Sequence, residues 1–255
     1  MPPNPLLDLA SRPVIGHRGA SAYAPENTLA SFHRADELGV DAFEFDVRAS
    51  SDGVAVVFHD PVLDRTTDQR GKVAVRTVAE LKSADAGYRF TTDGGKSFPW
   101  RGLGVRIPTL REVITAFPAM PLLIEIKERA VQDAVAQVLV ETGAASRAVV
   151  AASDQRALHA FANPPFTLGA SRRDIARLYF GTGAPHPACR CYAVPDRYYF
   201  LTVPSPRFVR RAHGRNSTVH VWTVDDGSIA VRLWNNGVNG IVTNQPDVIL
   251  NARPS

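Results

Sequence analysis

The feature that most constrains the fold is a repeated alternation of short apolar, strand-like runs with helix-like segments. Strands that alternate with helices indicate βα units and a parallel sheet. Eight such units in a chain of 255 residues match the size of a (β/α)8 barrel, an α/β fold. A doubly wound open sheet is the alternative architecture. The predicted core strands span 14–17, 42–50, 122–127, 148–152, 166–170, 189–194, 219–224 and 240–243.

Local signals predict helices between these strands. A helix is expected over 25–38, with Pro25 near its first turn and Gly39 as its C-terminal stop. Thr109 and Glu112 have the spacing of a capping box and predict a helix over 109–117. An extra strand, 54–58, follows the turn dipeptide Asp52-Gly53. Further helices are expected at 130–142, after 153–154, from 171 to 179, at 206–213, at 226–234 and after 246.

The segment 61–106 interrupts this repeat because it is too long for a simple loop. We expect a single TIM-barrel domain over 1–255 in which 61–106 is a loop-rich insertion after the second strand, over the barrel mouth. The insertion contains several glycines and four large aromatic residues. These aromatic side chains either pack the insertion onto the barrel or form a lid or a lipid-facing wall. They are Tyr88, Phe90, Phe98 and Trp100.

Composition excludes several classes of protein. No run approaches the ~20 apolar residues of a membrane-spanning helix, so no stable membrane insertion is expected. The first twelve residues do not read as a secretory signal, and two cysteines make no disulfide framework, so a cytoplasmic location is expected. The net charge is +4, but no dense basic run is interleaved with aromatic residues, which argues against a nucleic-acid partner. Nothing in the sequence specifies an oligomeric state.

Ionisable residues occupy two core strands where apolar residues are usual. Glu44 and Asp46 lie two apart in one strand, and Glu125 and Lys127 lie two apart in the next core strand, so each pair shares one face. Buried like charges raise each other's pKa and are costly unless something compensates them. Three carboxylates that converge on one point therefore predict a divalent cation. With no cysteine nearby, a hard ion is expected, either Mg²⁺ or Ca²⁺.

Other polar residues stand at predicted strand ends, which meet at the active-site face of a barrel. Arg18 and Lys127 can hold an anionic substrate, and a guanidinium suits a phosphate. His17 and His59 can exchange protons near neutral pH. Trp222 either packs in the core or forms an aromatic wall for an alcohol or glycerol group. Together with a metal, these residues predict hydrolysis of a phosphate ester, in which one histidine activates the nucleophile and the other protonates the leaving alcohol.

The motifs resemble those of the glycerophosphodiester phosphodiesterase family. They follow one another in the same order as in that family, over nearly the whole chain. The matching motifs are His17-Arg18-Gly19, Pro25-Glu26-Asn27-Thr28, Glu44-Phe45-Asp46, Asp52-Gly53, His59-Asp60-Pro61, Pro108-Thr109-Leu110, Glu125-Ile126-Lys127, Val221-Trp222-Thr223-Val224 and Gly237-Val238-Asn239-Gly240-Ile241.

This resemblance implies a TIM barrel that hydrolyses glycerophosphodiesters to sn-glycerol 3-phosphate and an alcohol. A lysophospholipase D is the alternative, and a catalytically silent binding barrel is the remote one. Asn239 and Asn244 stand where the family often has aspartates, which bears on substrate detail. The alcohol stays open, as do the choice of ion and the choice between water and an internal glycerol hydroxyl as nucleophile. The implied site residues are Glu44, Asp46 and Glu125 for the metal, His17 and His59 for acid and base, and Arg18 and Lys127 for the phosphate.

Overall fold

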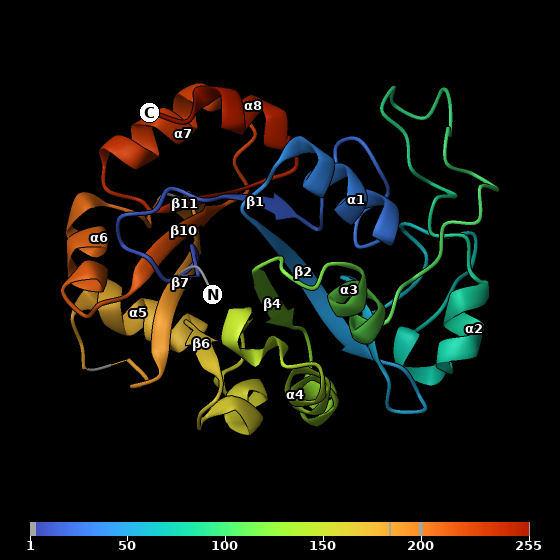
Figure 1. The fold of residues 1–255 in the computed structure, drawn as a ribbon, viewed down its shortest axis with the longest axis horizontal. Helices are drawn as coiled ribbons and strands as arrows, with labels where there is room; N and C mark the ends of the chain where they lie inside the picture. The colour runs from blue at the N-terminus through green and yellow to red at the C-terminus, as the bar shows by residue number, and fades with distance from the viewer. Residues whose placement is uncertain (1–3, 184, 199–200, 255) are drawn as a thin grey trace.

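A computed structural model describes residues 4–183, 185–198 and 201–254. Its centre is a closed barrel of eight parallel strands (Figure 1). Because β1 pairs in parallel with both β2 and β11, the ring is closed and the doubly wound open sheet is excluded. The predicted (β/α)8 barrel is thus confirmed. Around the ring, the strands are β1 (Val14–His17), β2 (Ala42–Ala49), β4 (Leu122–Ile126), β5 (Ala148–Ala152), β6 (Thr167–Gly169), β7 (Cys189–Pro195), β10 (Thr218–Trp222) and β11 (Gly240–Thr243).

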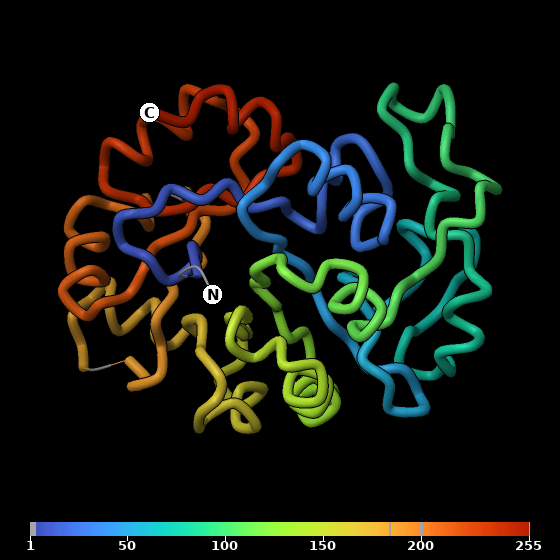
Figure 2. The backbone as a smooth tube through the Cα atoms, in the orientation of Figure 1, coloured from blue at the N-terminus to red at the C-terminus, as the bar shows by residue number. Residues whose placement is uncertain are grey.

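Helices surround this ring, and the chain can be followed from one βα unit to the next in Figure 2. The predicted capping box of Thr109 and Glu112 is confirmed at the start of α3. After β5, Asp154 caps the expected helix, which is the 3₁₀ helix η4 (Gln155–Phe161). In the described ranges, every helix is too short or too polar to span a bilayer. The α-helices are α1 (Leu29–Leu38), α2 (Val78–Ser83), α3 (Leu110–Ala116), α4 (Gln132–Glu141), α5 (Arg172–Phe180), α6 (Pro206–His213), α7 (Gly227–Asn235) and α8 (Pro246–Ala252).

The prediction that the first helix begins at Pro25 is wrong, since α1 begins at Leu29. Asn27 has a φ of 58°, in the left-handed region, which interrupts a right-handed helix. The Asn27 side chain donates a hydrogen bond of 2.9 Å to Asp46 on β2. Thr28 is extended and caps the helix with its hydroxyl. The turn before α1 is therefore shaped by a contact with the barrel interior.

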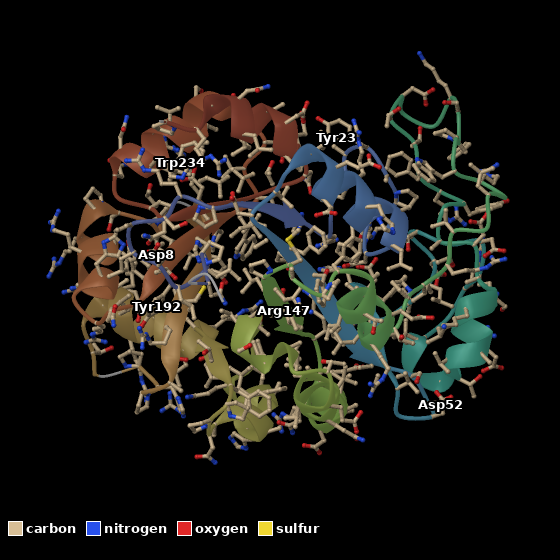
Figure 3. All side chains as sticks on the ribbon, in the orientation of Figure 1. Asp8, Tyr23, Asp52, Arg147, Tyr192 and Trp234 are labelled. Carbon is tan, nitrogen blue, oxygen red and sulfur yellow. The ribbon has the colours of Figure 1, made fainter. Side chains whose placement is uncertain are left out.

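Alternate residues of the barrel strands face inwards and outwards. On β2, Ala42 packs in the barrel interior, whereas Phe43 packs outwards with its ring centroid 5.1 Å from that of Phe32 on α1. The layer between strands and helices is filled by large apolar side chains, among them Tyr192 and Trp234 (Figure 3). This alternation means that residues two apart on a barrel strand point to the same side.

The N-terminal segment closes one end of the barrel. Leu6 is fully buried in the interior cluster. Its carbonyl oxygen accepts hydrogen bonds from the Thr218 hydroxyl at 2.6 Å and from the His220 ring at 2.9 Å. Thr218 is the first residue of β10, so Leu6 closes the end at which the strands begin. The end at which the strands finish remains as the mouth.

The segment 61–106 leaves the barrel after β3 (Ala55–Val57), which pairs antiparallel with β2. It contains η1 (Val73–Val75) and α2, and its apolar side chains form a separate cluster with Val56 and Phe58. Its last part is the long green loop at the right of Figure 2. The segment therefore packs beside the barrel, next to β3. The assignment of 1–255 to a single domain stays a prediction.

Candidate active site

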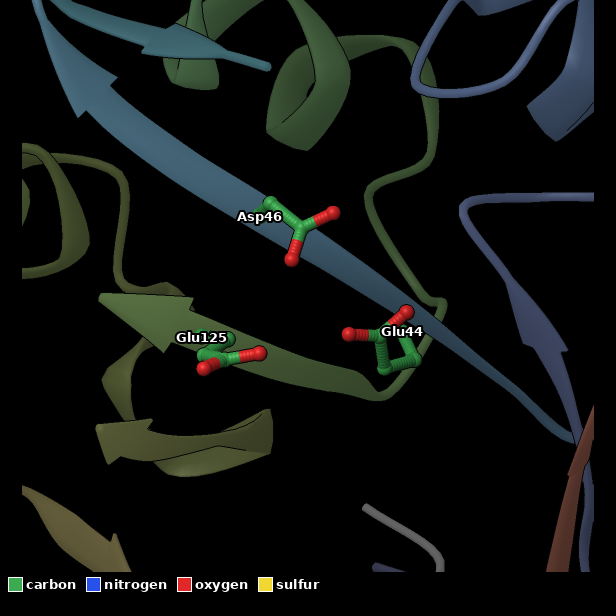
Figure 4. Close-up of side chains that lie close together, drawn as sticks. All are labelled: Glu44, Asp46 and Glu125. Atoms are coloured by element: carbon green, nitrogen blue, oxygen red, sulfur yellow. The ribbon is translucent and has the colours of Figure 1, made fainter. Parts of the chain in front are cut away.

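Strand register brings the predicted polar residues to one end of the barrel. Glu44 and Asp46 lie two and four residues after Ala42 on β2, so their side chains point into the barrel as that of Ala42 does. Asp46 is paired with Glu125 across β2 and β4, and Glu44 is paired with His17 across β2 and β1. Figure 4 shows the three carboxylates facing one another, and one oxygen of each lies within 4.8 Å of the others. Adjacent strands therefore supply a compact cluster of three carboxylates.

Two basic side chains lie against this cluster. The Lys127 ammonium lies 2.8 Å from Asp46 Oδ1 and 2.7 Å from Glu125 Oε2. Arg18 Nε lies 3.2 Å from Asp46 Oδ2. Burial by itself would raise the pKa of Asp46, but Lys127 and Arg18 outweigh burial and lower that pKa. Asp46 is therefore ionised at neutral pH, with a cation at each oxygen.

Among the described residues, no cation lies as close to Glu44 as Lys127 and Arg18 lie to Asp46. Only 8% of its surface is exposed, and its carboxylate accepts a hydrogen bond of 3.2 Å from the Arg18 backbone N–H. Burial, and then the charge of Asp46, raise the pKa of Glu44 well above its ordinary value. A divalent cation among the three carboxylates would supply the missing positive charge. Carboxylate oxygens are the ligands that Mg²⁺ and Ca²⁺ prefer, so these residues fit such an ion.

His17 is held in one tautomer by a chain of hydrogen bonds. The Asn244 amide nitrogen donates to Asp225 at 2.7 Å, so the Asn244 oxygen faces His17 Nδ1, also at 2.7 Å. An amide oxygen can only accept, so Nδ1 carries the ring proton and Nε2 does not. Nε2 lies 3.9 Å from Glu44. Burial, and then the charge of Arg18, lower the pKa of His17 below 6.5, so Nε2 can accept a proton at neutral pH.

His59 is held by a carboxylate at its own Nδ1. Asp60 Oδ1 lies 2.6 Å away. Burial by itself would raise the pKa of Asp60, but hydrogen bonds from Arg65 and His59 lower it to about 2. The ionised Asp60 can only accept, so His59 carries a proton on Nδ1. Arg65 also binds Glu26, and Glu26 binds Arg18 at 2.8 Å. A chain of ion pairs therefore connects His59 with Arg18, the residue predicted to bind the phosphate.

All of the site residues predicted from the sequence line one cavity of about 600 Å³. Trp222 is 44% exposed within this cavity wall, which excludes the alternative that it packs in the core. The closest charged partners of Lys127 are two of the carboxylates. The predicted residues that share the cavity are His17, Arg18, Glu44, Asp46, His59, Glu125, Lys127 and Trp222.

Sequence reasoning did not assign four supporting residues to the site: Asn27, Asp60, Asp225 and Asn244. Asn244 directly follows β11, and Asp225 lies shortly after β10. The rule that strand ends converge at the mouth could have identified both. Asn27 and Asp60 were visible only as neighbours of stronger motifs, because their roles depend on hydrogen bonds to Asp46 and His59.

The position of the insertion over the mouth stays a prediction, but the insertion beyond Pro61 does not contribute to the lining of this cavity. No residue between 62 and 106 lines the cavity. Arg101 instead holds two of the insertion's aromatic rings, with its guanidinium carbon 4.1 Å from the Tyr88 centroid and 3.9 Å from the Phe98 centroid. Cation–π contacts of this kind occupy the rings locally. The apolar wall of the cavity comes from α5 and from Tyr198, Leu201 and Val203.

A closed (β/α)8 barrel with three carboxylates and two oriented histidines at its mouth defines a barrel hydrolase. The chain matches the model of the glycerophosphoryl diester phosphodiesterase family over residues 17–248. It belongs to this family.

Relatives cover almost the whole chain. The chain is 32% identical to the glycerophosphodiester phosphodiesterase of Caldanaerobacter subterraneus subsp. tengcongensis, over 93% of this chain and 96% of the relative. It is also 32% identical to the putative glycerophosphodiester phosphodiesterase YhdW of Bacillus subtilis, with the same coverage of both chains. A solved Oleispira antarctica phosphodiesterase, in complex with the product sn-glycerol-3-phosphate, is 28% identical. It superposes with a TM-score of 0.75 and covers 95% of this chain and 97% of its own.

Proposed function

We propose that the protein hydrolyses glycerophosphodiesters to sn-glycerol 3-phosphate and an alcohol, with the help of a divalent cation. The observation that carries this proposal is the meeting of three carboxylates with His17 and His59 in one cavity. Membership of the family supports the reaction class. The Oleispira antarctica relative, whose structure is a complex with sn-glycerol-3-phosphate, supports the choice of product.

The basic side chains are suited to the phosphate. Arg18 is fixed in orientation because Nη1 binds Glu26 at 2.8 Å and Nε lies beside Asp46. A guanidinium has five N–H donors in a rigid fork, so Arg18 keeps donors for the phosphate oxygens. Lys127 would remain beside Asp46 and add positive charge at the same place. These two residues would bind the substrate and offset charge that develops on the phosphoryl group.

A divalent cation bound by Glu44, Asp46 and Glu125 would polarise the phosphoryl oxygens. The residues fit either Mg²⁺ or Ca²⁺, because both take carboxylate oxygens. The strongest sign of the fit is Glu44, whose pKa is raised by burial and by Asp46, as expected of a buried anion that lacks its own cation.

Each of the two histidines is oriented by a hydrogen bond at its Nδ1. His17 presents an unprotonated Nε2 towards the carboxylate cluster. We therefore assign His17 the role of the base that removes the proton from the attacking hydroxyl. His59 donates its Nδ1 proton to Asp60, so Nε2 is the nitrogen left for the substrate, and a ring that carries a second proton there would deliver it to the leaving alcohol. Asp60 fixes the orientation of that ring through the hydrogen bond at Nδ1. In this scheme, His17 takes a proton from the attacking hydroxyl, and His59 gives a proton to the leaving alcohol.

The metal requirement tests the proposal. Purified protein should release sn-glycerol 3-phosphate from glycerophosphocholine, lose this activity in excess EDTA and recover it with Mg²⁺ or Ca²⁺. Glu125→Gln keeps the side-chain shape but removes a charge, and should lower both metal affinity and activity about 10–100-fold. Glu37→Gln, on the exposed face of α1, is the matched control. Full activity in excess EDTA, or an unaffected Glu125→Gln protein, would contradict the proposal.

A further inference from the structure

Arg65, a residue of the insertion, connects two residues of the candidate active site. Its Nε lies 2.5 Å from Asp60 Oδ2, and the other oxygen of Asp60 lies 2.6 Å from His59 Nδ1. Its terminal nitrogens, Nη1 and Nη2, each donate to one oxygen of Glu26 at 2.7 Å. Glu26 also accepts from Arg18 at 2.8 Å. Of these five residues, His59 and Arg18 are the two that line the cavity among the described residues, so Arg65 acts on the site from behind.

The contacts of Arg65 differ from those of an ordinary surface ion pair. Exposed pairs between flexible side chains usually contribute little to stability. The Arg65 guanidinium instead binds three carboxylate oxygens of two residues, and its pairing with Glu26 is bidentate, which fixes direction as well as distance. The Arg65 side chain is 48% exposed, but the side chains of Asp60 and Glu26 are only 19% and 20% exposed. The planar fork therefore fixes two partly buried carboxylates relative to each other.

The backbone that carries Arg65 is anchored on both sides. Leu63 and Thr67 are fully buried, and Leu63 packs in the apolar cluster beside β3. The Leu63 carbonyl oxygen accepts hydrogen bonds from the Thr67 N–H at 3.1 Å and from the Thr67 hydroxyl at 3.0 Å. The guanidinium therefore extends from a fixed turn. It can hold Asp60 and Glu26 in place because its own backbone is held by the core.

We propose that Arg65 is a positioning residue that holds His59, the proposed acid, and Arg18, the residue proposed to bind the phosphate, in one geometry. The inference rests on the proposed function and adds a residue to it. Without the fork, the second oxygen of Asp60 would lose its partner, and Asp60 would be free to turn away from His59. Glu26 would keep only its contact with Arg18 and would hold that residue less firmly. The phosphate and the leaving alcohol would then be less well aligned with the groups that act on them.

Arg65→Gln tests this role in kinetics with two substrates. For glycerophosphocholine, kcat should fall about tenfold, at the lower end of the loss that follows removal of a group that orients a functional side chain. For a glycerophosphodiester with an activated aryl leaving group, the loss should be smaller, because that leaving group needs no proton from His59. Arg34→Gln is the matched control, since Arg34 on α1 is 47% exposed and is also paired with a carboxylate.

Arg65→Lys separates the planar fork from its charge. Lysine keeps the positive charge, but a single ammonium group on a flexible chain cannot reproduce the three contacts in their fixed directions. It should therefore recover only part of the lost kcat. Equal losses for the two substrates, kinetics of Arg65→Gln that match those of Arg34→Gln, or full recovery by Arg65→Lys would each overturn the proposal.

Nuclear magnetic resonance of protein with ¹⁵N-labelled histidine tests the positioning without catalysis. The Nδ1 proton of His59, which Asp60 accepts, should exchange with solvent about tenfold faster in Arg65→Gln and at an unchanged rate in Arg34→Gln. An unchanged rate in Arg65→Gln would overturn the proposal. Failure of the proposed function has a different signature: no glycerophosphodiester would be hydrolysed under any metal condition, while exchange at His59 would still depend on Arg65.

Discussion

Replacing Asn244 with leucine should uncouple His17 from the hydrogen bonds that fix its tautomer. The Asn244 amide donates to Asp225 at 2.7 Å, and its oxygen accepts from Ser21 at 2.6 Å and from His17 Nδ1 at 2.7 Å. Leucine has a similar volume but can form none of these bonds. The backbone N–H of residue 244 would still reach Asp225, so the local backbone should be kept.

The size of the effect follows from these contacts. Removing a group that orients a functional histidine costs about 10–100-fold in activity, and complete loss of a positioned base costs about 10²–10⁴-fold. We therefore expect kcat for the Asn244→Leu protein to fall about 10²-fold. Unpaired polar groups on His17 and Asp225 should lower the free energy of unfolding by about 1–3 kcal/mol. Asn235→Leu, at an exposed position at the end of α7, is the control.

Asn244→Asp separates orientation from charge. It restores an acceptor for His17 Nδ1 and adds a negative charge, which raises the pKa of His17. A base must be unprotonated to act, so a raised pKa moves the acidic limb of the kcat/KM profile to higher pH. In the unsubstituted protein, burial and Arg18 lower the pKa of His17, which places this limb below pH 6.5.

Steady-state kinetics with glycerophosphocholine between acidic and neutral pH measure both effects. The reasoning is refuted if Asn244→Leu retains the turnover of the unsubstituted protein. It is also refuted if the acidic limb of Asn244→Asp does not move. Partial recovery of kcat by Asn244→Asp, accompanied by that shift, is the result that a purely structural role of Asn244 does not explain.

The remaining predictions concern the other side of the reaction and the phosphate. His59→Ala should lower kcat about 10²–10⁴-fold for a poor leaving group, and less for an activated aryl leaving group, because the latter needs no proton; equal losses for both substrates would remove His59 from the role of acid. Arg18→Lys keeps the charge but loses the planar fork held by Glu26, so kcat/KM should remain strongly impaired. Unimpaired kcat/KM for Arg18→Lys would show that charge alone is sufficient.

The carboxylate cluster could be predicted because it depends on the pleat of a strand. Glu44 and Asp46 are two apart, so they face the same side of the strand in any sheet that contains it. The apolar residues that alternate with them fill the outer layer against α1, which leaves the barrel interior for the carboxylates. Only the pairing of Asp46 with Glu125 required the strand order of a barrel.

The supporting residues could not be derived in this way. Asn244 is 227 positions from His17 along the chain, and its orientation depends on Asp225. Asn27 was placed within a helix because Pro25 favours a helix start, but its left-handed backbone and its bond to Asp46 place it in the preceding turn. In both cases a contact between distant segments decides the local structure, and local sequence preference is a weak guide to such contacts.

The same distinction explains why local sequence could not decide between the two roles considered for the aromatic residues of the insertion. The aromatic residues of the insertion were a visible signal, but Arg101 lies against the rings of Tyr88 and Phe98 beside the barrel. Phe180 gives no such signal, because a single apolar residue at a helix end is ordinary. Its exposure to the cavity arises only because α5 turns that face to the mouth, across the barrel from α2 (Figure 1). The apolar lining of the cavity thus lies on the α5 side of the mouth, while the residues proposed for catalysis lie mainly on β1, β2 and β4.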